Sequence, residues 1–218
     1  PASGRSLLEA WTTRKASSSG EGEAPAPLIE NDLGSGSDYT VFLNFLGVPV
    51  ADLNFDGPYG VYHSRYDDRY WMEHFGDPGY RYMTAMVEVW GRLALRHANA
   101  EVHAYDLRQY ATTVRGFLDA LAGVPGAAGE LDLTAAVTAV AAWQSEAEAL
   151  QKKIDAALAS GEAPPASSLS ALNAALLRVE RELLVADGIP GRPWFKHGLY
   201  APRYTYAAMS LPGVREAA

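Results

Sequence analysis

Four long segments beyond residue 77 carry apolar residues mostly in steps of three and four, and this spacing constrains the fold more than any other feature of the chain. A repeat of this kind places the apolar side chains on one face of an α-helix. Four such segments in succession predict a helical bundle. The predicted stripes are Tyr80, Met83, Val87, Trp90 and Ala94; Leu107, Tyr110, Val114, Phe117 and Leu121; Leu133, Val137, Val140, Ala147, Leu150 and Ile154; and Leu169, Leu172, Leu176, Val179 and Leu183.

Signals at the ends of these segments support the helices. Pro78 is expected at the first position of the first helix, and Gly123 is expected to close the second. Gly161 and Pro164 interrupt the third, and Gly188 is expected to end the fourth. The first stripe is flanked by further apolar residues, and a bundle with additional apolar faces is typical of a protein that pairs with a partner.

The first 70 residues have a different character. Residues 1–37 contain Ser, Gly, Glu and Pro runs that are typical of a surface loop. Asp38 then predicts the N-cap of a helix that Gly47 ends, and residues 48–55 alternate like a strand. A helix that feeds a strand through a glycine turn is typical of α/β proteins.

Composition excludes several classes of function. The chain has 18 basic and 26 acidic residues, a formal net charge of −8, so it offers no basic field to nucleic acid. It has no cysteine, which excludes thiolate metal sites and cysteine nucleophiles and leaves metal chemistry to His, Asp and Glu. No apolar run reaches the roughly 20 residues of a membrane helix. The chain begins at Pro1, so we expect a mature or trimmed piece of something longer.

The densest polar cluster spans residues 62–68 and includes His63. A neutral imidazole is a common zinc ligand, and a nearby carboxylate can fix its tautomer. The spacing alone favours a structural histidine, because the segment has no His-Glu-x-x-His and no close His pair. Farther along, aromatic and basic residues interleave over 194–206, which favours a docked loop that lines a site.

Seven short motifs occur in order along the chain: residues 6–11 (SLLEAW), 33–39 (LGSGSDY), 62–67 (YHSRYD), 75–78 (FGDP), 191–193 (GRP), 200–202 (YAP) and 211–213 (LPG). Taken in order, they resemble the C-terminal part of the glutamate carboxypeptidase II and transferrin receptor family. The resemblance implies that residues 1–70 are the C-terminal edge of a zinc-peptidase α/β domain, that 71–190 form a four-helix dimerisation domain, and that 191–218 return to the peptidase site. The fold class is then mainly α with an α/β remnant.

In catalytic members of that family, a two-zinc site takes its last ligand from a Tyr-His-Ser motif. The resemblance therefore implies that His63 is a zinc ligand, and that Tyr62 donates to an oxyanion or a substrate carboxylate. The other ligands and the general base lie upstream in the family. The fragment alone is therefore expected to bind no zinc stably and to be inactive.

The same resemblance assigns the substrate-binding positions to Ser35, Ser37, Asp52, Asn54, Thr205 and Tyr206. Glutamate-specific members have a Lys where Thr205 stands, and arginines where Asp52 and Asn54 stand. Loss of these cations disfavours acidic substrate residues. The resemblance therefore implies a zinc-dependent exopeptidase with carboxypeptidase-like hydrolysis of small peptides, and these departures predict that it does not select acidic ones.

Three interpretations follow. The first is the C-terminal part of a zinc exopeptidase that forms a homodimer through its bundle. The second is a non-catalytic receptor-like or scaffold protein, and the third is an independent helical dimerisation module. The resemblance also implies an extracytoplasmic location.

Overall fold

The computed structural model describes residues 9, 33, 37–55, 59–124, 131–162, 164–203 and 207–216. Within these residues the chain is mainly helical, as predicted, with one small two-stranded sheet. All four predicted helices form. They are α4 (Arg81–Ala98), α5 (Leu107–Ala122), α6 (Thr134–Ala159) and α7 (Ala166–Glu182).

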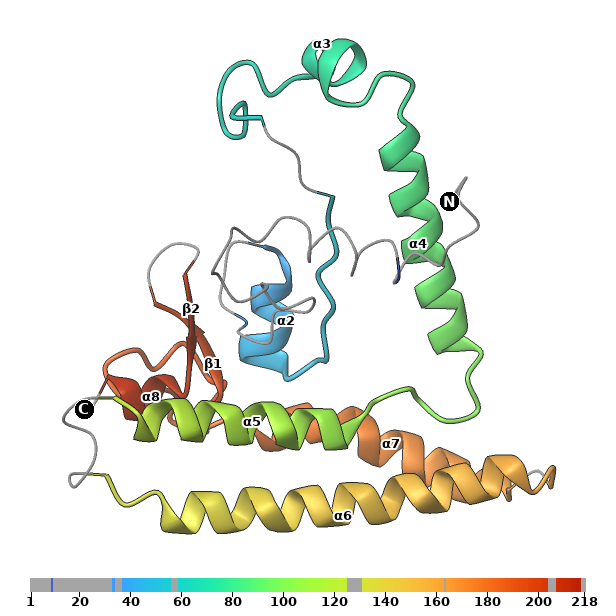
Figure 1. The fold of residues 1–218 in the computed structure, drawn as a ribbon, viewed down its shortest axis with the longest axis vertical. Helices are drawn as coiled ribbons and strands as arrows, with labels where there is room; N and C mark the ends of the chain where they lie inside the picture. Colours follow the sequence, from blue (N-terminus) through green and yellow to red (C-terminus); the bar gives the residue numbers. More distant parts are fainter. Residues whose placement is uncertain are drawn as a thin grey trace.

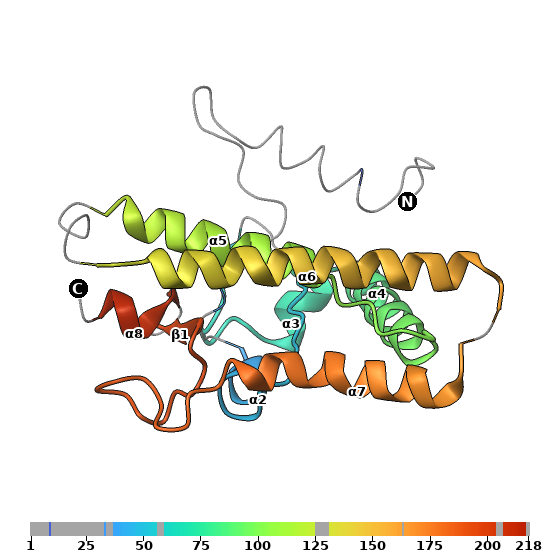
Figure 2. The same ribbon diagram turned by 90° about the horizontal axis from the view of Figure 1, so that it is seen from below.

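Helices α5, α6 and α7 run along one another and form the base of the molecule (Figures 1 and 2). The core lies where α5 meets α6 and the C-terminal segment. It contains Leu43, Val114, Phe117, Leu118, Leu121, Val140, Tyr200 and Leu211. Four of these eight residues come from the predicted stripe of α5 or lie beside it, so the apolar spacing determined which face of this helix is buried.

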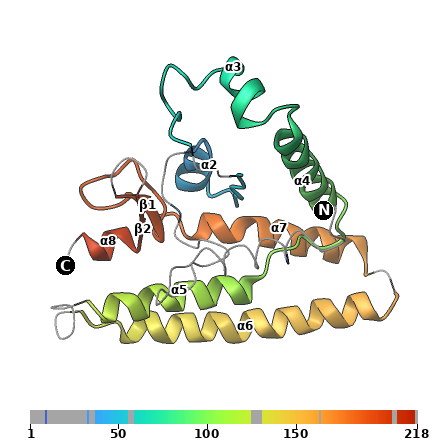
Figure 3. The ribbon, with the colours of Figure 1, turned by 45° about the horizontal axis from the view of Figure 1, so that its top comes forward.

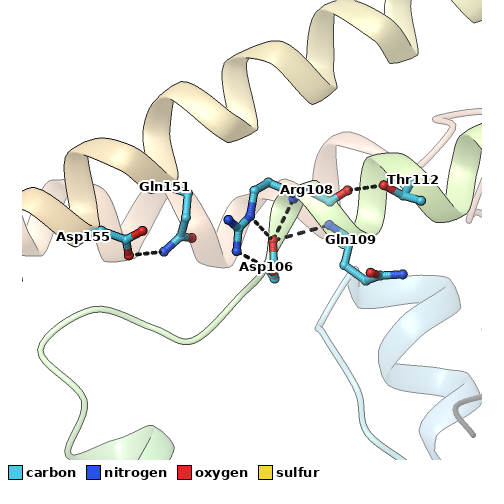
Figure 4. Close-up of polar contacts among 6 residues, drawn as sticks. All are labelled: Asp106, Arg108, Gln109, Thr112, Gln151 and Asp155. Carbon is cyan, nitrogen blue, oxygen red and sulfur yellow. Dashed lines mark hydrogen bonds and ion pairs between the residues drawn. The ribbon is translucent and has the colours of Figure 1, made fainter.

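Helix α5 begins at a carboxylate cap. The side chain of Asp106 accepts hydrogen bonds from the backbone N–H groups of Arg108 (3.0 Å) and Gln109 (3.4 Å), which have no partner within the helix. The Arg108 guanidinium donates back to the same carboxylate at 2.9 and 2.8 Å. Figure 4 shows this cluster beside the Gln151–Asp155 pair of α6, whose hydrogen bond is 2.8 Å long.

Helix α4 leaves the base formed by the other three helices (Figures 1 and 3). It has no buried residue, although its apolar stripe is present. Its start also differs from the prediction, because Pro78 lies in the preceding turn and not in the first helical turn. Asp77 caps the helix instead, accepting from the backbone N–H groups of Tyr82 (3.2 Å) and Met83 (2.9 Å).

The N-terminal region contains a shorter helix and an extended stretch. Helix α2 (Tyr39–Leu46) ends as predicted at Gly47, which has φ +57°. The predicted strand at 48–55 is wrong. This stretch is extended and unassigned, because the described part of the chain supplies no strand to pair with it. It leads through a loop to α3 (Arg69–Trp71) and the π-helical turn η1 (Met72–Gly76).

The segment after α7 docks against the core, as its aromatic content predicted. It ends in the hairpin of β1 (Tyr200–Pro202) and β2 (Ala208–Ser210), in which Ala201 pairs with Met209, followed by the short helix α8 (Pro212–Arg215). The last predicted helix stops at Glu182 and not near Gly188. No helix in the described ranges is both long and apolar enough to cross a membrane.

Candidate functional site

The Tyr62–Asp67 loop precedes α3 and carries the predicted metal ligand. Its backbone makes two turns, closed by hydrogen bonds from Ser64 N to Val61 O (2.9 Å) and from Asp67 N to Ser64 O (3.2 Å). His63 has φ +59°, a left-handed conformation that histidine adopts more readily than bulky or β-branched residues. The loop therefore places His63 at the outer corner of a tight turn.

The side chains of Tyr62 and His63 lie together. Their rings stack with centroids 3.9 Å apart and planes 20° apart, and both residues are exposed. The His63 backbone N–H donates to Asp67 Oδ2 at 3.4 Å, so a carboxylate lies close to this turn. An imidazole, a phenol and a carboxylate on one exposed loop are groups that could bind a metal or a substrate.

The described residues do not complete a metal site around His63. They contain no group of three or more His, Cys, Asp or Glu side chains placed to hold an ion. Zinc in a catalytic site takes three protein ligands as a rule. The part of the chain that the structure describes therefore does not fit the whole of the zinc site that the resemblance implies, and the further donors would have to come from outside it.

The other predicted substrate residues lie on separate stretches. Ser37 precedes α2, and its carbonyl accepts from the Thr40 hydroxyl at 2.9 Å. Asp52 and Asn54 are exposed on the extended stretch that follows α2. Ser35, Thr205 and Tyr206 lie outside the described residues. The pocket formed by these positions thus remains a prediction.

A buried polar network joins three segments that the sequence analysis did not connect. Glu180 of α7 accepts from the Tyr110 hydroxyl of α5 at 2.8 Å, and its Oε1 lies 2.8 Å from His197 Nε2. The Leu199 N–H donates to His197 Nδ1 at 3.2 Å, so the ring proton lies on Nε2 and is donated to Glu180. His197 is 0% exposed and Glu180 is 7% exposed.

This network assigns His197 a structural role, because its ring lies within hydrogen-bond distance of Glu180 and of the Leu199 backbone. Burial, and then the Glu180 carboxylate, raise the pKa of Tyr110 far above its ordinary value, so its phenol keeps the proton that it donates. The sequence does contain a signal for the network. Glu180 stands four residues after Leu176, on the apolar stripe of its helix, where an acid requires a buried partner.

Comparison with known proteins places this chain among peptidase relatives. The transferrin receptor-like dimerisation domain family matches residues 131–218, which begin just before α6. The probable glutamate carboxypeptidase LAMP1 of Arabidopsis thaliana is 33% identical over 198 residues, which cover 90% of this chain and 28% of that protein.

Of two further relatives, one is named as an aminopeptidase and the other as an inactive zinc metalloprotease. The aminopeptidase NAALADL1 of Rattus norvegicus is 30% identical over 85% of this chain and 26% of its own length. The inactive zinc metalloprotease C354.09c of Schizosaccharomyces pombe is 28% identical over 81% of this chain and 24% of its own length. The chain thus spans about a quarter of the length of these relatives. Residues 131–218 belong to the transferrin receptor-like dimerisation domain family, and the chain is homologous to a C-terminal portion of proteins named glutamate carboxypeptidases and aminopeptidase NAALADL1.

Proposed function

We propose that this chain forms the homodimer contact of a zinc-dependent exopeptidase and supplies His63 as one of its metal ligands. The observation that carries the dimer is the exposed apolar stripe of α4, and the match to a dimerisation domain farther along the chain, at residues 131–218, supports it. Val87 is 71% exposed and Met83 is 49% exposed, although both lie on an amphipathic helix. Apolar surface of this kind is typical of a face that a protein partner covers.

Sedimentation at micromolar concentration tests the dimer directly. The expected mass is about twice the 23.4 kDa of one chain. A clean monomer over this concentration range would overturn the dimer proposal.

The peptidase part of the proposal rests on the relatives' names and on the exposed Tyr62–His63 loop. In the product of the complete gene, His63 would contribute one nitrogen ligand to a site whose other donors lie outside this chain. Tyr62 beside it would donate a hydrogen bond to the substrate. On this proposal residues 1–70 complete a peptidase domain, 71–190 form the dimer, and 191–218 reach back to the substrate.

Elemental analysis of the complete gene product tests this part. Close to two zinc ions per chain are expected, and His63→Ala should remove one of them with most of the peptide turnover. His74→Ala, which changes another exposed histidine of the same region, should leave both unchanged. If His63→Ala left zinc content and turnover intact, His63 would not be a ligand.

The substrate preference is a further element of the proposal. Asp52 and Thr205 replace cations of the glutamate-specific members, so the peptidase would not select acidic residues. The double change of Thr205→Lys and Asp52→Arg in the complete protein should shift its preference toward acidic peptides. An unchanged preference would mean that these loops do not line the pocket.

A non-catalytic scaffold is the second candidate, since one relative is named as an inactive zinc metalloprotease. It predicts a stable dimer of the complete gene product with no bound zinc and no peptide hydrolysis.

A further inference from the structure

The segment that joins α4 to α5 determines where α4 points, and one side chain of α7 holds this segment at two places. The backbone N–H of His103 donates to Asn173 Oδ1 at 3.0 Å. The Asn173 amide nitrogen donates to the carbonyl of Glu101 at 2.9 Å. Because both groups of one amide are used, residues 101–103 are anchored to the base of the molecule independently of α4.

The last turn of α4 reaches this anchored segment through a cluster of three rings. The rings of His97 and His103 stack with centroids 5.0 Å apart and planes 13° apart. His97 Nε2 lies 3.1 Å from the Tyr105 hydroxyl, and the His97 and Tyr105 ring centroids are 5.1 Å apart. We call His97, His103 and Tyr105 the ring cluster. All three residues are partly buried.

The hydrogen bonding and stacking within the ring cluster suit neutral histidine rings better than charged ones. His103 Nδ1 is buried and has no hydrogen-bond partner among the described residues. A proton placed on this nitrogen would be a buried donor without an acceptor, which is unfavourable. A second proton on His97 would add a like charge across the 5.0 Å stack.

Three charged groups belong to the elements that form or contact the ring cluster. From α7, the Glu180 carboxylate acts on Tyr105, but it already accepts from Tyr110 and His197. Burial, and then Glu180, raise the pKa of Tyr105, so its phenol stays neutral near pH 7. Glu101 lies in the joining segment, where its carbonyl is held by Asn173, and on α4 itself Arg96 adjoins His97 with a further positive charge.

We propose that the ring cluster is an acid-sensitive latch that holds α4 in its present direction and releases it when its histidines gain protons. Histidine side chains in general change charge between about pH 5 and 8. Added protons would create an unpartnered buried donor and a like charge across the stack, so the latch is expected to weaken as the pH falls. Its release would change the direction of the exposed apolar stripe of α4. The proposal does not depend on zinc binding or on peptidase activity.

Electron spin resonance distance measurements test the latch within one chain. The natural sequence has no cysteine, so Ala85→Cys on α4 and Ala171→Cys on α7 give two exposed labelling sites. Diluting the labelled protein with excess unlabelled protein removes distances between copies. The expected result is one narrow distance distribution at pH 8 and a broadened or shifted one at pH 5.

Variants separate the latch from general acid effects. The double variant of His97→Gln and His103→Gln has no ring proton to gain, so its distribution should be the same at both pH values. The control is His74→Phe. His74 stacks on Tyr70, precedes α4 and is not part of the ring cluster, so this variant should keep the pH response. Asn173→Leu, which removes the anchor, should broaden the distribution already at pH 8.

Two results would overturn the proposal. The first is an unchanged distribution of the parent protein between pH 8 and pH 5. The second is a pH response that persists in the double histidine variant. If circular dichroism shows that the double variant does not fold, His97→Gln alone replaces it. At least half of the pH-dependent change in the distance distribution should then be lost. A full response in the single variant would again contradict the latch.

Discussion

Glu180 is the residue on which the packing of the C-terminal segment depends most. Its carboxylate is the shared acceptor for a phenol on α5 and an imidazole on the segment after α7. His197 is fully buried and Tyr110 is partly buried, so water is a poor replacement for this acceptor. Removal of Glu180 therefore takes away the shared acceptor of both donors at once.

We expect Glu180→Ala to lower the free energy of unfolding by about 2–4 kcal/mol, since unsatisfied buried donors cost about 1–3 kcal/mol each. Urea denaturation monitored by circular dichroism measures this change. Glu148→Ala removes an exposed acid of α6 and should change stability by less than about 0.5 kcal/mol. Equal effects of the two substitutions would show that the network does not stabilise the fold.

Gly47 provides a second test at the scale of single residues. It has φ +57°, and a Cβ atom built there would lie 2.8 Å from the Cα atom of Arg181. Gly161 has φ +70° with nothing within 4 Å of its Cβ position. Both positions are strained for alanine, but only the first also brings the end of α2 against α7.

We expect Gly161→Ala to cost about 1 kcal/mol through left-handed strain alone. Gly47→Ala should cost about 2–3 kcal/mol, because backbone overpacking adds to the same strain. Parallel urea denaturation curves give the difference between the two variants. A difference of zero would mean that α2 does not pack closely on α7.

At the scale of elements, the start of α5 combines a cap with an ion pair. The hydrogen bond from the Arg108 side chain is the largest contribution that holds the pKa of Asp106 below its ordinary value, and the capped backbone N–H groups add to it. A carboxyl with a lowered pKa stabilises the folded state above its unfolded pKa. That contribution is lost as the pH falls through the lower folded value.

We expect Asp106→Ala to destabilise the protein by about 1 kcal/mol at pH 7 through loss of the cap. Asp106→Asn retains a capping oxygen, so it should keep most of this stability. It should lose only the contribution of the negative charge, which the parent protein itself loses below about pH 4. Thermal melting at pH 7 and pH 3 distinguishes the two variants. An Asn variant as unstable as the Ala variant at pH 7 would show that the charge, and not the cap, stabilises the helix start.

At the scale of the whole molecule, α4 is the element whose stability the described residues explain least. An 18-residue amphipathic helix without a buried residue has few tertiary contacts to hold it. The proposed dimer would cover its stripe of Met83, Val87 and Trp90. Dimer formation and α4 stability should then change together.

We expect Val87→Glu to weaken the dimer at least tenfold, because it places a charge on the covered stripe. Ala85→Glu adds the same charge about 200° around the helix and should leave the dimer intact. Sedimentation over a concentration series measures both. Equal weakening by the two variants would argue against this stripe as the contact.

The extent to which the sequence predicted the molecule differs from feature to feature. The four helices and the turn at Gly47 were predictable, because apolar spacing and capping residues act over a few neighbouring positions. The strand expected at 48–55 was wrong, because alternation alone cannot supply a hydrogen-bonding neighbour. His63 was identified as a candidate from its motif, but its exposed position beside Tyr62 depends on the turn conformation.

The sequence by itself determined which segments are helical and which face of α5 is buried, since both follow from local periodicity. Only the tertiary structure showed that Glu180 joins Tyr110 to His197 and that α4 leaves the base. It also showed that Asn173 anchors residues 101–103. These features depend on contacts between residues as many as 72 positions apart, and no local pattern encodes the distance between such groups.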